Sequence, residues 1–355
     1  MNETSYRVHI LPGAIDAIGG VVRVVVRAHR YVIVTDSNVG PHYAERAKSA
    51  LTGLSCEIIT IPAGETHKTR ATWASVTDQM LEAGFGRDCA VIAMGGGVVG
   101  DLAGFVAATF MRGVPVVQVP TTLLAMLDAS IGGKTAVDTP AGKNLVGAFH
   151  HPSAVIIDPS VLATLPPEQM RAGLSEAIKH GVIADPAHFA AAATFGAALM
   201  DHHQDARSTS AIVARSVEIK SAVVASDVRE SGRRKTLNFG HTIGHAIEHL
   251  SGYALLHGEA VSIGMCLEAA LAERMGVAEP GTADRIRAAC AGAGLPTERP
   301  ANLDPQRILE LSRGDKKGRA GRAQYALPTR IGAMAFADSG WSAPVEDALV
   351  LEVLR

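Results

Sequence analysis

The chain has 355 residues, 47% of them hydrophobic and 19% charged, which suits a globular protein large enough for two domains. Its 33 Lys and Arg residues nearly balance 35 Asp and Glu, and a formal net charge of -2 argues against a nucleic-acid binder that works by bulk charge. The N-terminal residues lack the pattern of a signal peptide, and the longest apolar run is too short to span a bilayer. Four well-separated cysteines without a CxxC pair indicate reduced, mostly buried thiols, so we expect a cytoplasmic protein.

The first half of the chain alternates short apolar runs with helical patterns. Five runs, each ending in Gly, Pro or Asp, predict strands: “YVIVTD” (31–36), “EIITIPAG” (57–64), “CAVIAMGG” (89–96), “PVVQVP” (115–120) and “AVIIDP” (154–159). Helical patterns separate several of them, as in “TRATWASVTDQMLEAG” (69–84). This alternation predicts a parallel sheet with helices on its faces.

After about Pro166 the sequence pattern changes from alternating strands and helices to mainly helices. Segments such as “PEQMRAGLSEAIKHGVI” and “GEAVSIGMCLEAALAERMG” have helical periodicity and little strand character. Near the C-terminus, “AQYALP” and “GAMAFAD” are candidates for two short strands. We therefore predict a Rossmann-like α/β nucleotide-binding domain at residues 1–160 and a mainly α-helical domain at residues 161–355.

A glycine-rich turn follows the run at 89–96. Gly95, Gly97 and Gly100 form a G-x-G-x-x-G pattern between a predicted strand and a predicted helix, where backbone N–H groups can approach a pyrophosphate. The acidic residue that usually follows about 20 residues later is missing, because that region reads “VPTT”. Asp36, at the end of an earlier strand, could hold a ribose instead. The sequence therefore favours a non-standard dinucleotide site over a simple tight turn.

Charged and histidine side chains stand at structured positions in the second half. “GLSEAIKHG” places Glu176 and Lys179 on one predicted helical face, which is also the pattern of an ordinary surface ion pair. A polar stripe would share a face wherever its segment is helical: Arg234, Asn238, His241 and His245. “LLHGEA” adds His257 at the start of another apolar helix. Several of these atoms could bind a metal, although a single histidine is more often a packing residue.

Two familiar motifs are only partly matched. “HTIGH” has the histidine spacing of zinc peptidases, but Thr242 replaces their catalytic Glu, so peptidase chemistry is not expected. “GGKT” resembles the end of a P-loop, but the required earlier glycine is missing and the surrounding stretch reads as a loop. The whole set still combines possible metal ligands, many cations and a nucleotide-type turn. That combination predicts a metal enzyme acting on a phosphorylated, polyhydroxylated anion.

Nearly the whole chain resembles the 3-dehydroquinate synthases, a family of sugar-phosphate cyclases. Long, specific segments carry the likeness in chain order: “VTDSNV”, “PAGETHK”, “GGGVVGDLAGFVAATFMRG”, “QVPTTLLAMLDASIGGKTAVD”, “GKNLVGAF”, “GLSEAIKHG”, “LNFGHTIGHAIE”, “LHGEAVSIGM” and “DKK”. The resemblance implies NAD+, a divalent metal (zinc or cobalt) and a homodimer, with the cofactors held between a nucleotide domain and a helical domain. It places the metal ligands at Glu176, His241 and His257.

The resemblance also assigns the nucleotide and substrate sites. Its NAD+ contacts fall on Asp36, Asn38, Glu65, Lys68, Gly95, Gly96, Gly97, Asp101, Thr121, Thr122 and Lys143. The family's catalytic residues correspond to Lys134, Lys179, Glu230, Arg234, Asn238 and His245. Further substrate contacts correspond to Arg112, Asp128, Asn144, Lys220 and one or other of Lys316 and Lys317. Arg112 matches an arginine that the family supplies across a dimer interface.

The implied reaction is a carbon–oxygen lyase step of the shikimate pathway to aromatic amino acids. It converts 3-deoxy-D-arabino-heptulosonate 7-phosphate to 3-dehydroquinate and phosphate. A metal-bound ring hydroxyl would be oxidised by NAD+, phosphate would be eliminated, and the hydride would then be returned. Ring opening and an intramolecular aldol closure would complete the sequence. Positioning and charge stabilisation would be much of the protein's task.

Three other functions stay open on the sequence: another sugar-phosphate cyclase, a metal-dependent alcohol dehydrogenase, and an inactive NAD-binding relative. The presence of Arg234, Asn238 and His245 favours the synthase. Spacing alone would pair His241 with His245 as chelators, whereas the resemblance leaves His245 to face the substrate. His249 matches nothing in the family pattern and is predicted to be structural.

Overall fold

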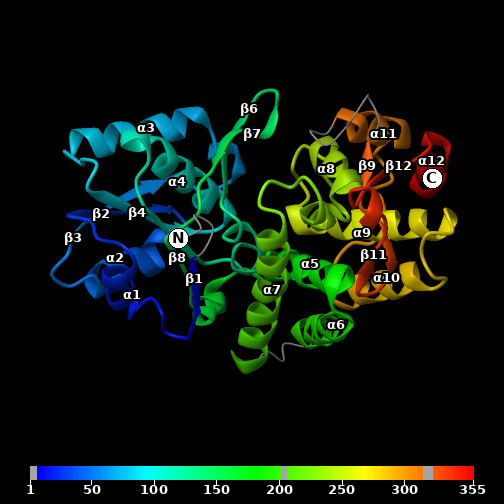
Figure 1. Cartoon of the computed structure of the whole chain (residues 1–355), viewed down its shortest axis with the longest axis horizontal. Helices are drawn as coiled ribbons and strands as arrows, with labels where there is room; N and C mark the ends of the chain where they lie inside the picture. Colours follow the sequence, from blue (N-terminus) through cyan, green and yellow to red (C-terminus); the bar gives the residue numbers. More distant parts are fainter. Residues whose placement is uncertain (1–5, 201–205, 315–322) are drawn as a thin grey trace. The chain divides into compact units, whose positions relative to one another are not determined.

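The computed structural model describes residues 6–200, 206–314 and 323–355 and divides the chain into two compact units, Met1–Leu165 and Pro166–Arg355 (Figure 1). The division falls a few residues beyond residue 160, where the sequence places the domain boundary. The first unit has a parallel sheet with helices and the second is mainly helical, which confirms the predicted fold class. In the described ranges, no helix has both the length and the apolar character needed to cross a membrane.

Six parallel strands form the central sheet of the first unit, in the order β1-β8-β5-β4-β2-β3. The strands are β1 (Arg7–Ile10), β2 (Arg30–Asp36), β3 (Ser55–Ile61), β4 (Cys89–Gly95), β5 (Val116–Pro120) and β8 (Ala154–Ile157). The helices are α1 (Ile18–Val25), α2 (Gly40–Ala50), α3 (Arg70–Glu82) and α4 (Gly97–Thr109). The five predicted strands are confirmed. The sequence analysis missed β1, whose four residues “RVHI” carry too little pattern to be recognised.

The central strands are buried along almost their whole length. On one face of the sheet, Val34 of β2 and Val91 of β4 belong to a core that includes Met80 of α3 and Leu102 of α4. Strands covered on both faces need apolar side chains at every position, which explains their continuous apolar runs.

The strand order creates a switch point between β2 and β4. The chain passes from β2 outward to β3 and then returns to the other side of β2 to form β4. Val34 pairs with Ala93, so the carboxyl ends of these strands, at Asp36 and Gly95, lie side by side. In open parallel sheets, ligands bind beyond the carboxyl ends of the strands at such a point. The fold thus brings Asp36, the candidate for binding a ribose, and the glycine turn to the same edge of the sheet.

Residues 134–149 correct one expectation, because this stretch is a β-hairpin and the sequence suggested a loop. Strand β6 (Lys134–Thr139) pairs antiparallel with β7 (Gly142–Phe149). A glycine of this hairpin serves close packing: a Cβ on Gly147 of β7 would lie 2.1 Å from the Thr135 carbonyl oxygen. “GGKT” leads into a strand, whereas a P-loop leads into a helix, so the P-loop is excluded.

The second unit is built from helices with two short strand pairs. The helices are α5 (Pro167–Ala184), α6 (Pro186–Met200), α7 (Ala206–Ser226), α8 (His241–Leu250), α9 (His257–Arg274), α10 (Thr282–Gly292), α11 (Pro305–Gly314) and α12 (Asp347–Leu354). The strand pairs are β9 (Gln324–Tyr325) with β12 (Ala343–Pro344), and β10 (Pro328–Arg330) with β11 (Ala333–Met334). Both short strands predicted near the C-terminus are therefore present. The four cysteines are free thiols and only Cys56 is not buried, as predicted.

Helices α5, α8 and α9 approach one another closely because glycines line their contacts. A Cβ on Gly258 would lie 1.8 Å from the carbonyl oxygen of Ala172 in α5. A Cβ on Gly264 would lie 1.9 Å from the carbonyl oxygen of Gly240, just before α8. Any larger residue at either position would force the helices apart. This packing determines how near the polar side chains of the three helices can come.

The polar stripe of the second half does not lie on one continuous helix. Arg234 and Asn238 belong to a short 3-10 helix, η5 (Arg233–Asn238), and the chain turns at Gly240, where φ is +80°. A new helix, α8, begins at His241. His241 and His245 therefore lie one turn apart on the same helix. The position of Arg234 relative to these histidines depends on the turn at Gly240.

Candidate active site

Three polar side chains from three helices meet in the second unit. Glu176 comes from α5, His241 is the first residue of α8, and His257 is the first residue of α9. The Nε2 atom of His241 lies 3.6 Å from Oε1 of Glu176, and the Nε2 atom of His257 lies 4.0 Å from the same oxygen. Two imidazole nitrogens and a carboxylate oxygen are donors that zinc accepts.

The other nitrogen of each imidazole ring faces an acceptor. Nδ1 of His241 is 3.1 Å from the carbonyl oxygen of Phe239, and Nδ1 of His257 is 3.2 Å from Oε2 of Glu248. A hydrogen on each Nδ1 leaves Nε2 with its lone pair toward Glu176, as in metal-binding histidines. Burial lowers the pKa of His257, but the hydrogen bond and charge of Glu248 outweigh it, so this pKa stands above its ordinary value.

Glu176 and Lys179 form a buried ion pair, which rules out the surface pair that their spacing also allowed. Glu176 is fully buried, and Lys179 pairs with its Oε2, whereas its Oε1 faces the two histidine Nε2 atoms and has no hydrogen-bond donor among the described residues. A buried carboxylate oxygen without a donor is costly, and a metal ion bound by this oxygen and the two nitrogens would satisfy it. The residues present therefore fit a divalent metal.

His245 lies close enough to belong to the same cluster. Possible ligand atoms of His241, His245 and His257 all lie within 4.8 Å of one another. The ring centroids of His245 and His257 are 5.7 Å apart. Two three-ligand sets thus share His241 and His257, one completed by Glu176 and the other by His245.

A loop held by Asp227 carries the next group of polar residues. The carboxylate of Asp227 accepts hydrogen bonds from the backbone N–H groups of Ser231, Gly232 and Arg234 at 3.0, 2.7 and 3.0 Å. Burial raises the pKa of Asp227, but these donors lower it by more, to below its ordinary value. The loop holds Glu230 in a left-handed conformation, with φ of 60°. An ionised Asp227 therefore fixes the backbone on both sides of this residue.

Glu230, Arg234 and Asn238 are brought together by that loop and by η5. Nδ2 of Asn238 donates to Oε1 of Glu230 at 2.6 Å. Arg234 is 2% exposed, and its Nη1 donates to the carbonyl oxygen of Val228 at 2.7 Å. A buried guanidinium is suited to bind an anion such as a carboxylate or phosphate.

In the first unit, the residues assigned to NAD+ gather at the carboxyl edge of the sheet. Oδ1 of Asp36 accepts the N–H groups of Asn38 and Val39 at 2.8 and 2.9 Å. The N–H of Thr121 donates to the carbonyl oxygen of Gly95 at 2.9 Å, which ties the end of β5 to the glycine turn. Helix α4 begins at Gly97, so its N-terminus opens at this turn. That arrangement can accept a pyrophosphate.

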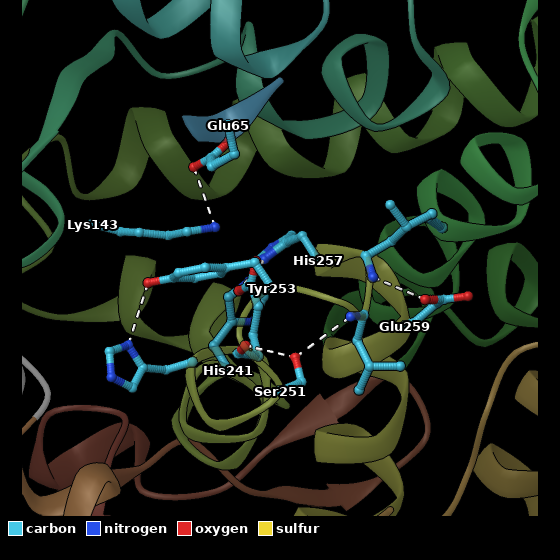
Figure 2. Close-up of polar contacts among 12 residues, drawn as sticks. Glu65, Lys143, His241, Ser251, Tyr253, His257 and Glu259 are labelled. Atoms are coloured by element: carbon cyan, nitrogen blue, oxygen red, sulfur yellow. Dashed lines mark hydrogen bonds and ion pairs between the residues drawn. The ribbon is translucent and has the colours of Figure 1, made fainter. Parts of the chain in front are cut away.

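A charge cluster lies beside the glycine turn. Nζ of Lys68 is 3.0 Å from Asp101 and 3.4 Å from Glu65. Lys143 pairs with Glu65 at 3.3 Å (Figure 2). Burial lowers the pKa of Lys68, but Asp101, Glu65 and Asp138 raise it by more, so it stays charged. Two lysines are thereby fixed next to the turn.

Three of the four remaining predicted pocket residues of the first unit lie in irregular or strained backbone. Arg112 and Asn144 have positive φ, at 68° and 55°. The N–H of Asn144 donates to Asp138 at 2.8 Å. Asp128 lies in the π-helical turn η3 (Ala125–Ala129), and Lys134 begins β6. Lys316 and Lys317 lie outside the described residues.

Two buried carboxylates of the second unit were missed by the sequence analysis. Glu248 contacts His257, and Glu268 of α9 accepts the N–H groups of Gly240 and Ile243 at 2.7 and 3.0 Å, where α8 begins. Both are almost fully buried. A signal was available, because each interrupts an otherwise apolar helical face, in “HAIEHL” and “GMCLEAALA”.

Two family models, described as 3-dehydroquinate synthase N-terminal and 3-dehydroquinate synthase C-terminal, match residues 58–172 and 173–318. The chain belongs to the 3-dehydroquinate synthase family. A 3-dehydroquinate synthase of Xanthomonas axonopodis pv. citri is 46% identical to it, over 98% of this chain and 95% of the relative. The resemblance stated from the sequence is thus confirmed.

Solved structures place the family within the sugar-phosphate cyclases. A 2-deoxy-scyllo-inosose synthase complexed with carbaglucose-6-phosphate, NAD+ and Co2+ superposes with a TM-score of 0.90 at 27% identity, covering 99% of this chain and 96% of that one. A 2-epi-5-epi-valiolone synthase from Streptomyces hygroscopicus subsp. jinggangensis, with NAD+ and Zn2+ bound, has a TM-score of 0.89 at 30% identity, covering 100% and 97%. Both relatives therefore contain the two cofactors expected from the sequence.

Proposed function

We propose that this chain is a 3-dehydroquinate synthase, which converts 3-deoxy-D-arabino-heptulosonate 7-phosphate to 3-dehydroquinate and phosphate with NAD+ and a divalent metal, zinc or cobalt. The observation that carries the proposal is the meeting of two histidine Nε2 atoms at the buried carboxylate of Glu176. It stands in a chain 46% identical to a 3-dehydroquinate synthase, whereas the cyclases with other products are 27% and 30% identical. Glu176, His241 and His257 hold the metal in this proposal.

The cofactors supply what protein side chains cannot. The metal, when bound, favours loss of a proton from a coordinated hydroxyl. NAD+, when bound, provides reversible hydride transfer, so the overall reaction is redox-neutral. Asp36 binds a ribose hydroxyl, and the N-terminus of α4 with Lys68 and Lys143 binds the pyrophosphate side of the cofactor.

The chain's own contribution is to bind and orient a polyanion. Lys179, Lys220 and Arg234 are buried cations of the second unit, at 1%, 6% and 2% exposure. Buried cations bind phosphate and carboxylate strongly, because little water competes with the ligand. His245, one turn along α8 from His241, hydrogen-bonds a substrate hydroxyl and can move its proton.

Strained backbone supports the assignment of three pocket residues. Arg112, Asn144 and Glu230 are non-glycine residues with φ between 55° and 68°. Such conformations cost about 1–3 kcal/mol each and gather at functional sites, where a side chain must point in an unfavourable direction. The family resemblance assigns all three to the pocket on the sequence alone. We infer that the strain aims their side chains at the substrate.

The homodimer and the cytoplasmic location also remain proposals. They follow from the resemblance, in which Arg112 serves a neighbouring subunit's site. Arg112 stands in a turn with positive φ at Met111, Arg112 and Gly113 in succession. Size measurement by light scattering tests the dimer, and an Arg112→Ala variant that stays dimeric but loses substrate affinity would support its role.

The proposed function is tested by following three products in one incubation. Purified protein, NAD+, Zn2+ and the heptulosonate phosphate are expected to release phosphate and form 3-dehydroquinate in equal amounts, with no net NADH. Accumulation of NADH without phosphate release would instead identify an alcohol dehydrogenase. Turnover of another sugar phosphate alone would identify a different cyclase. Tight NAD+ binding without any turnover or bound metal would identify an inactive relative.

Asp227→Ala is expected to lower kcat/KM by about 10²-fold. The loop carrying Glu230 loses three backbone hydrogen bonds. A displacement of a pocket side chain by about 1 Å is enough to lower the rate by about this factor. Metal content is expected to stay at the wild-type level, since the loop holds none of the proposed ligands. Steady-state kinetics and zinc analysis check both statements. Asp304→Ala is the matched control, because Asp304 also accepts a backbone N–H, from Gln306, and both of these residues are exposed. An unchanged kcat/KM for Asp227→Ala would show that the loop does not contribute to the active site.

A further inference from the structure

Glu248 stands directly behind one of the proposed metal ligands. It lies on α8 and is 4% exposed, and its Oε2 is 3.2 Å from Nδ1 of His257 at the start of α9. None of the roles that the family resemblance implies falls on this residue. The position still needs an explanation, because a carboxylate so deeply buried costs free energy unless donors or positive charge lie nearby.

The two histidines proposed as metal ligands are oriented by different partners. Nδ1 of His241 faces the neutral carbonyl of Phe239 at 3.1 Å, whereas Nδ1 of His257 faces the carboxylate of Glu248. Both partners keep the ring hydrogen on Nδ1 and leave Nε2 toward Glu176. A carboxylate also makes the imidazole a stronger electron donor than a carbonyl does. His257 is therefore the ring whose donor strength depends on a neighbouring charge.

His257 stands between Glu248 and the position proposed for the metal, with Nδ1 toward Oε2 of Glu248 and Nε2 toward Glu176. A divalent metal held by His257 would supply positive charge to the carboxylate through the imidazole. The arrangement would then be a carboxylate–histidine–metal relay, and changes to the outer carboxylate of such a relay typically cost 10- to 100-fold in affinity.

We propose that Glu248 is a positioning residue for His257 and that its charge sets the affinity of the site for the divalent metal. The inference rests on the proposed function, because it presumes that His257 is a ligand. It extends that function by naming the side chain that controls metal retention.

The test is the dissociation constant for Zn2+ alone, measured on metal-free protein by competition with a chromophoric chelator. Glu248→Gln keeps the shape and an acceptor oxygen but removes the charge, and we expect binding roughly 10-fold weaker. Glu248→Ala removes the orientation as well, and we expect a loss of up to about 100-fold. A role confined to packing predicts that the isosteric glutamine variant binds Zn2+ like the wild type.

Cobalt gives a second readout that packing does not affect. The visible absorption bands of bound Co2+ report the ligand field, which changes when His257 becomes a weaker donor. We expect the bands of Glu248→Gln to shift relative to the wild type, and metal-free thermal unfolding to be unchanged. Identical bands and an identical dissociation constant would contradict the inference.

Glu259→Gln is the matched control. Glu259 lies two residues after His257, and its Oε2 accepts the N–H of Leu256 at 2.8 Å, which caps α9 (Figure 2). Glutamine serves equally well in such a cap. This variant removes an equal charge near the same helix end, and we expect its zinc affinity to match the wild type. Equal weakening in Glu259→Gln would mean that general electrostatics, and not the contact with His257, sets the affinity.

The outcomes separate the inference from the function beneath it. A wild-type protein that binds no Zn2+ would overturn both. Tight binding by the wild type and by both Glu248 variants would overturn the inference alone and leave the proposed synthase in place. Loss of folding in Glu248→Ala would leave Glu248→Gln, with its unchanged volume, to decide.

Discussion

His257→Ala protein is expected to lose its metal and its activity together. Removing one of the ring nitrogens that face Glu176 leaves too few donors to retain zinc through purification. The metal contributes several kcal/mol of transition-state stabilisation, so kcat should fall by about 10³-fold or more. Zinc per chain, by elemental analysis, and phosphate release measure the two effects on one preparation.

His249 is the control histidine, because it is exposed on α8 and is not a proposed ligand. Its Nδ1 lies 3.3 Å from the hydroxyl oxygen of Tyr253. His249→Ala should keep both zinc and turnover at the wild-type level. Stoichiometric zinc in His257→Ala would count against its role as a ligand, whatever happened to activity. Loss of zinc in both variants would point to a general disturbance of the helical unit.

His245→Ala is expected to keep its zinc while turnover falls by about 10²- to 10⁴-fold, the usual contribution of a general acid or base. The experiment is decisive because His245 is near enough to His241 and His257 to complete a three-histidine set. Zinc analysis and kcat on the same preparation distinguish a ligand from a substrate-facing residue.

Glu176→Gln provides the complementary measurement. If Glu176 completes the ligand set, this variant loses zinc and His245→Ala retains it. The reverse pattern would transfer the third ligand position to His245 and correct the assignment made from the family resemblance. Oε1 of Glu176 favours the first pattern, because it is buried, faces both histidine Nε2 atoms and has no hydrogen-bond donor among the described residues.

The fold of the first unit was predictable because its signals are local. Strands β2 and β4 are covered on both faces, so every position is apolar and the run stands out from its neighbours. The hairpin β6–β7 was not predictable in this way, because its glycines suit a loop equally well. Only the pairing of Lys134 with Phe149 shows that they permit close strand contact.

Much of the candidate site was also visible in the sequence, but only as separate motifs. The resemblance named Glu176, His241 and His257, and periodicity placed His245 one turn from His241. Periodicity could not reveal that the stripe through Arg234 is broken at Gly240. It also could not distinguish a surface ion pair from the buried pair of Glu176 and Lys179, since spacing on a helix says nothing about what covers it.

By itself, the sequence determined the order and type of the elements, the glycine turn and the family, because each depends on residues that are neighbours along the chain. The tertiary structure alone decided which polar atoms face one another. Glu176 meets the two histidines only because Gly258 lets α9 approach α5 and Gly264 lets it approach the turn before α8. Glu248 reaches His257 through the same packing, and contacts of this kind depend on helix separations that no local pattern records.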